Sequence, residues 1–183
     1  MNPYISIWTN PRPTIDYIIS RRWSVGAQFF PFALTGINGI ATGDYLALLP
    51  IDNFLTSMIF IVVLGAFIGA LGSLIWTRIV FLSGQTLKGK ASVRSIEKVF
   101  ALAFIPEILI TIHWVSMAIL NKDHTIQPNL NSPLYFIANI LSWRILVIGL
   151  ARTHKFSHGT AIVSIFLPYL TLVAIVATIK GLL

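Results

Sequence analysis

The feature of this sequence that most constrains its fold is the near absence of charge from five long apolar stretches. The chain has 13 Lys and Arg residues and six Asp and Glu residues, and only Glu107 and Arg144 fall inside these stretches. About 20 apolar residues are needed for a helix to cross a membrane. The sequence therefore predicts an all-α polytopic membrane protein, a bundle of five transmembrane helices. The predicted spans are 24–42, 54–76, 99–120, 134–150 and 161–179.

Composition excludes several classes of protein. Hydrophobic residues make up 56% of the 183 residues and charged residues only 10%, whereas soluble domains carry about 25% charged residues. A soluble enzyme and a disordered chain are therefore both excluded. The chain has no cysteine, which removes disulfides, thiolate metal sites and cysteine nucleophiles. We expect two parts, a cytoplasmic or interfacial N-terminal segment, 1–23, and a five-span domain, 24–183.

The positive charges predict the orientation in the membrane. If the N-terminus is cytoplasmic, only Lys122 and Lys180 fall on the outer side, as the positive-inside rule requires. Five spans then place the C-terminus on the opposite face. The inner side would carry Arg12, Arg21, Arg22, Arg78, Lys88, Lys90, Arg94, Lys98, Arg152 and Lys155.

The residues before the first span predict a short in-plane helix. Thr14 is expected to cap a helix over 15–22 that places Ile15, Ile18 and Ile19 on one face. The net charge of +7 favours anionic membrane lipids as partners over nucleic acid, because the chain is so apolar. The expected anionic-lipid contacts are Arg21, Arg22, Lys88, Lys90, Arg94, Arg152 and Lys155.

Glu107 and Arg144 are the strongest candidates for a polar site inside the membrane. Glu107 lies about 13 Å along a helix from Lys98, and Arg144 lies about 12 Å from Arg152. The two side chains are thus expected at one depth, and we predict an ion pair between the third and fourth spans. Three roles remain open for these residues: a structural lock, a proton-coupled or anion site, or an Arg144 that reaches toward the membrane surface without a partner.

The remaining polar residues of the spans are secondary candidates. His113 is expected to be a hydrogen-bonded packing residue rather than a proton relay. Ser164, Thr171 and Thr178 recur every seven residues, and we expect this stripe to face the bundle, for packing rather than as a pathway. The sequence contains no nucleophile–base constellation and no metal-ligand cluster, so we expect neither a catalytic site nor a cofactor.

Small residues and prolines predict helix contacts and kinks. Gly39 with Gly43, and Gly65 with Gly69 and Ser73, have the four-residue spacing that lets helix backbones approach closely. We favour contacts within one chain over a dimer seam. A proline inside a span removes a backbone hydrogen bond, so kinks are expected at positions 106 and 168.

Several segments form a recognisable series along the chain: the opening Asn2–Arg12, the loop Gly84–Ser92, the pair Ile105–Pro106, and Trp143, Gly149–Leu150, His154–Ser157 and Ala161. In this order and spacing they resemble the Ypt-interacting-protein (Yip) domain family of five-span membrane proteins, of the bacterial type. The resemblance implies five spans, a cytosolic N-terminus and a bacterial inner membrane. Eukaryotic relatives associate with Rab-type GTPases in vesicle traffic.

Two functions from different classes fit these features. The first is a non-enzymatic, membrane-organising protein that binds lipids or a partner, with a homo-oligomer or another membrane protein left open. The alternative is a small carrier or channel for an ion, a proton-coupled solute or a lipid, with a polar cavity at Glu107 and Arg144. A cavity that reaches Glu107 would favour transport, and a dry, packed pair would favour the first function.

Overall fold

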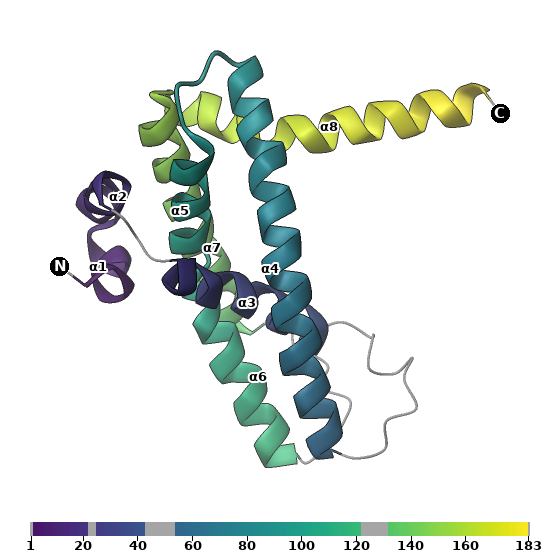
Figure 1. Ribbon diagram of the computed structural model, residues 1–183. Coiled ribbons are helices and arrows are strands. Elements are labelled where there is room, and N and C mark those ends of the chain that lie inside the picture. The colour runs from purple at the N-terminus through teal and green to yellow at the C-terminus, as the bar shows by residue number, and fades with distance from the viewer. Residues whose placement is uncertain (1, 22–24, 43–53, 122–131, 183) are drawn as a thin grey trace.

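The computed structural model describes residues 2–21, 25–42, 54–121 and 132–182, and this part of the chain consists of helices joined by short turns, without a β-strand (Figure 1). The all-α fold is therefore confirmed. The helices are α1 (Pro3–Thr9), α2 (Pro11–Ser20), α3 (Val25–Thr42), α4 (Phe54–Thr86), α5 (Val93–Ala103), α6 (Ile108–Asn121), α7 (Pro133–His154) and α8 (His158–Leu182), with a 3₁₀ turn at Ile105–Glu107.

Four of the described segments are long and apolar enough to cross a membrane, and they correspond to the second to fifth predicted spans. They are Leu55–Thr86, Val93–Met117, Pro133–His154 and His158–Thr178. The first predicted span becomes α3, which lies against α4 (Figure 1). Large apolar side chains, among them Phe67 and Val173, are about two-thirds exposed on the helix surfaces, as expected for contact with lipid.

The helix α4 is longer than the predicted span, which ended at Trp76. It continues to Thr86 and has 33 residues, or about 50 Å, more than the hydrocarbon thickness. No proline or glycine interrupts residues 77–83, so the helix runs on beyond the apolar stretch to the basic loop. In this extension of α4, the Arg78 guanidinium group forms an ion pair with Glu97 of α5, with 3.2 Å between Nη2 and Oε1.

Proline 106 divides the third predicted span, as expected. The helix α5 ends at Ala103, the 3₁₀ turn follows, and α6 begins at Ile108. Pro168, by contrast, lies inside α8 without ending the helix. The turn places Glu107 between two helices, where its side chain and carbonyl group are both available to neighbouring elements.

The contact between α3 and α4 rests on glycine. An added Cβ atom at Gly36 or Gly69 would strike the backbone of the facing helix, and one at Gly65 would strike the backbone of Ile37. The contact made by Gly65 and Gly69 is within the chain, as favoured. Gly36 takes the place expected of Gly39, which has open space around it, and Gly43 lies outside the described residues.

The N-terminal segment forms two helices rather than one. The helix α2 starts at Pro11 instead of residue 15, because proline is well suited to the first helical turn. Thr14 therefore lies within the helix and is not its N-cap, and its side chain is buried. Ile15 and Ile18 share one face of α2, as predicted, and that face is buried in the core of the protein. The segment lies beside the bundle (Figure 1).

Two cations of the bundle hold α2 in place. Lys98 donates hydrogen bonds through Nζ to the carbonyl groups of Ile18 (3.0 Å), Ile19 (3.3 Å) and Arg21 (2.5 Å). Arg152 of α7 forms a two-pronged ion pair with Asp16, with Nε 2.6 Å from Oδ1. A cation is favourable at a helix C-terminus because the last carbonyl groups have no partner within the helix.

Candidate functional site

Glu107 lies at the centre of a polar cluster between α3 and α6. The Asn38 amide Nδ2 donates to the Glu107 carbonyl oxygen (3.0 Å) and to Oε2 of the carboxyl group (3.3 Å). The Oδ1 atom of Asn38 accepts hydrogen bonds from Thr111 (2.8 Å) and from the indole of Trp114 (3.0 Å). Asn38 and Trp114 are both buried. The cluster therefore satisfies a buried amide completely and fixes the position of Glu107 from one side.

The other side of Glu107 faces a cavity of about 450 Å³ between α4, α5, α7 and α8. Asn139 and Ser142 of α7 share its lining with Glu107, and the Ser142 Oγ atom is buried without a hydrogen-bond partner in the described structure. Aromatic side chains form most of the remaining wall: Trp76, Phe100, Phe104, Trp143, Phe166 and Tyr169.

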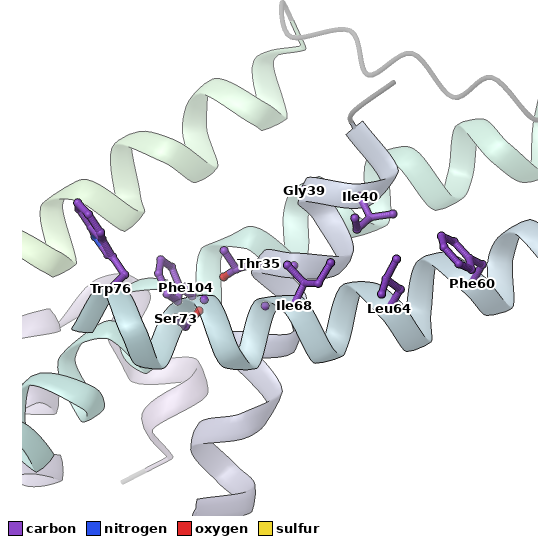
Figure 2. Close-up of a pocket in the computed structure, with 12 residues that line it drawn as sticks. Thr35, Gly39, Ile40, Phe60, Leu64, Ile68, Ser73, Trp76 and Phe104 are labelled. Carbon is purple, nitrogen blue, oxygen red and sulfur yellow. The ribbon is translucent and has the colours of Figure 1, made fainter. Parts of the chain in front are cut away.

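A second cavity, of about 700 Å³, adjoins the first along α4. Trp76 and Phe104 line both cavities. Figure 2 shows Phe60, Leu64 and Ile68 following one another along α4 on the wall of this second cavity. We call the two cavities together the α4 groove. Its lining is mostly apolar, with polar side chains at Glu107, Asn139 and Ser142 in the first cavity and at Thr35 and Ser73 in the second.

The expected ion pair between Glu107 and Arg144 is not formed. The ion pairs in the described structure join Arg78 to Glu97 and Arg152 to Asp16. Arg144 is exposed and lines a different cavity, with Arg12 and His158. Equal depth in the membrane does not determine which way each side chain points around its helix axis. Asn38, a neutral amide, is the partner of Glu107 in place of the predicted Arg144.

The secondary polar candidates are only partly where we expected them. Ser164 is buried and donates to the Ala161 carbonyl (2.7 Å), while its own carbonyl accepts from Ser83 (2.7 Å). Thr171 and Thr178 are exposed instead of facing the bundle. Their hydroxyl groups donate to carbonyl groups one turn earlier in α8, at 2.9 and 2.8 Å, so they need no neighbouring helix.

His113 is partly buried on α6, and within the described residues no hydrogen bond involves its side chain. The hydrogen-bonded packing role that we expected is therefore not seen. His113 and Glu107 line no common cavity among those described above.

The residues expected to contact anionic lipid differ in their freedom to do so. Arg21, Lys88, Lys90, Arg94 and Lys155 are exposed. Arg21 lies over the Tyr17 ring, 4.5 Å from its centroid. Arg152 is also exposed but is held by Asp16, and Arg22 lies outside the described residues.

Sequence reasoning missed the importance of three polar residues. Asn38 was not singled out as a candidate within the first predicted span. A single amide among apolar residues is itself a signal that its side chain has a buried hydrogen-bond partner. Ser142 lies among apolar residues in the same way. His154 is buried against Gly84 and Gly89, where no Cβ atom would fit, and its ring stacks on Phe156. Nothing local in the sequence predicts that contact.

The apolar helices define a multi-pass α-helical membrane protein with a groove along its longest helix. The Yip1 domain family model matches residues 5–179, nearly the whole chain. The chain therefore belongs to the Yip1 domain family, as the resemblance implied. Comparison with curated proteins gave no match. Comparison with solved structures gave none either.

Proposed function

We propose that this chain is a non-enzymatic, membrane-organising protein that binds a lipid, or another membrane-dissolved molecule, in the α4 groove. The observation that carries the proposal is the position of Glu107, Asn139 and Ser142 on the wall of a cavity that is otherwise lined mostly by apolar and aromatic side chains. Ser142 has an unsatisfied buried hydroxyl group, and such a group costs free energy unless a ligand or water binds it.

The size and lining of the groove favour an amphipathic ligand. Cavities of about 450 and 700 Å³ fall within the usual range of small-molecule sites. An apolar chain would lie against Trp76 and Phe104, which both cavities share. A hydroxyl or amide of the ligand would donate to the Glu107 carboxyl group and accept from Ser142.

The test compares two glutamates of the same chain. The protein is purified in mild detergent, and the lipids that it retains are extracted and quantified by mass spectrometry. We expect Glu107→Gln and Ser142→Ala to deplete one retained species several-fold. Glu97→Gln changes a partly buried carboxylate that is paired with Arg78 and lines neither cavity of the α4 groove, and it serves as the matched control. Identical retained lipids in E107Q and E97Q would overturn the proposal.

A carrier for an ion, a proton-coupled solute or a lipid is the second candidate. It is supported by the cavity that reaches Glu107, because an ionisable group at a cavity within a membrane is typical of transport pathways. A pH-sensitive dye trapped in proteoliposomes measures proton flux. Flux that is lost in E107Q but kept in E97Q would favour the carrier over a lipid-binding role.

The location and partners of the chain are part of the same proposal. We place it in the inner membrane of a bacterium, with the N-terminus in the cytoplasm and the C-terminus on the opposite side. The exposed Lys88, Lys90, Arg94 and Lys155 would then contact anionic lipid. A homo-oligomer or a membrane-protein partner is compatible with the exposed apolar surface.

A further inference from the structure

A third cavity, of about 620 Å³, lies between α7 and α8 beside α2. We call it the arginine groove. Its ionisable lining residues come from three different helices, and its other lining residues are apolar or aromatic. Its defining residues are Arg12, Arg144 and His158, with Ile148, Ile162 and Phe166.

Helix geometry gives this groove a direction. His158, Ile162 and Phe166 are four residues apart and follow one face of α8, and Arg144 and Ile148 are four apart on α7. His158 is the first residue of α8, so the groove starts at the basic end of the bundle and continues along the helices. Its far end is the stacked pair of Trp143 and Phe166, with ring centroids 5.5 Å apart. This pair separates it from the α4 groove, since both residues line both cavities.

The two arginines have no acidic partner in the described part of the chain. Its three carboxyl groups have other neighbours: Asp16 pairs with Arg152, Glu97 pairs with Arg78, and Glu107 accepts from Asn38. A charged group in a membrane span is costly unless it is paired or hydrated. An anion that pairs with Arg144 therefore comes from outside these residues, and the surrounding apolar surface favours one that carries an acyl chain.

The fold also holds Arg12 beside the groove. Asp16 lies one turn after Arg12 on α2 and is bound to Arg152 of α7. Lys98 binds the C-terminal carbonyl groups of the same helix. Arg12 is thus presented to the groove from a fixed helix, which lowers the entropic cost of forming a two-arginine site.

We propose that the arginine groove binds one anionic phospholipid. Its phosphate group is held by the guanidinium groups of Arg12 and Arg144, and an acyl chain lies against Ile162 and Phe166. Guanidinium groups suit this role because they bind phosphate oxygens through two parallel hydrogen bonds. The site uses none of the polar groups of the α4 groove and does not depend on the function proposed above.

The test counts bound lipids by native mass spectrometry after release from nanodiscs. The nanodiscs are made of phosphatidylcholine with a small fraction of phosphatidylglycerol. We expect one tightly retained phosphatidylglycerol per chain, and about fivefold weaker retention in each of Arg144→Gln and Arg12→Gln. Arg78→Gln is the matched control, because it removes the same charge from an exposed arginine that is paired with Glu97 and does not line the groove.

Three results would overturn the proposal. Retention reduced as much in R78Q as in R144Q would show that the attraction is only a general effect of surface charge. If phosphatidylcholine were retained as tightly as phosphatidylglycerol, the site would not require a headgroup with net negative charge. Displacement by millimolar glycerol phosphate would show a site for a soluble phosphate without an acyl chain. If R144Q fails to fold, R12Q, on an exposed part of α2, decides the question. Loss of the α4 groove ligand in E107Q, with phosphatidylglycerol retained, would separate the two proposals.

Discussion

At the scale of single residues, Asn38 is the side chain that connects the buried polar groups between α3 and α6. Its amide group serves Glu107, Thr111 and Trp114 at once. Asn38→Ala leaves a buried indole N–H without its acceptor, and an unsatisfied buried group costs about 1–3 kcal/mol. We expect a clear fall in the thermal unfolding temperature, measured in detergent by tryptophan fluorescence. Asn139→Ala is the control, because Asn139 bonds only to a carbonyl of its own helix, and an equal fall there would contradict the assignment.

The glycines of α4 allow a test of close helix packing. Gly69 touches the backbone of α3, whereas Gly72, one turn further along, has open space where a Cβ atom would be. Gly69→Ala must push two backbones apart, and overpacking of this kind costs about 1–3 kcal/mol or more. Gly72→Ala should be neutral or slightly stabilising, because alanine is the better helix former. Thermal unfolding of the two variants compares them directly, and equal midpoints would refute the contact.

At the scale of helices, the attachment of α2 depends more on Lys98 than on the Asp16–Arg152 pair. Exposed ion pairs contribute about 0–1 kcal/mol, whereas Lys98 donates hydrogen bonds to three carbonyl groups at the C-terminal end of α2. We expect Lys98→Met to accelerate amide hydrogen exchange across α2 by several-fold and Arg152→Gln to have the smaller effect. Lys90→Met, at an exposed lysine, should leave the exchange unchanged. The reverse order for Lys98 and Arg152 would contradict this ranking.

The break between α5 and α6 illustrates how one local signal positions a site. Pro106 cannot donate a backbone hydrogen bond, and the chain forms a 3₁₀ turn there. Glu107 follows at once, with its carbonyl oxygen open to Asn38. The sequence predicted the break, because proline acts on its own neighbours. It did not predict the partner, because Asn38 is 69 residues away.

At the scale of the whole molecule, the positive charges and the fold make one prediction about topology. The structure brings α2, the middle of α5 and the end of α7 together through Lys98 and through Asp16–Arg152. Because the chain has no cysteine, single cysteines can report accessibility without further changes. We expect Lys88→Cys and Lys155→Cys in sealed inverted vesicles to react with a membrane-impermeant maleimide. Lys122→Cys should react only after the vesicles are opened, and reaction of all three in sealed vesicles would refute the orientation.

The accuracy of the predicted spans and the failure of the predicted pair have one explanation. The free energy of transferring an apolar segment from water into the membrane depends only on the residues of that segment. The predicted spans 134–150 and 161–179 therefore fall inside α7 and α8. The depth of Arg144 in the membrane likewise follows from its position within its own span. Its direction around the helix axis depends on how α7 packs against α2 and α8, and that packing turned it toward Arg12 and His158.

By itself, then, the sequence determined the helical class, the membrane location and the break at Pro106. Each follows from hydrophobicity or backbone chemistry within a short segment. Only the tertiary structure decided that an amide would hold Glu107, that Ser142 would lack a partner, and that Arg12 and Arg144 would share a groove. These arrangements depend on the rotation of each helix about its axis, which many distant contacts set together and no single segment encodes.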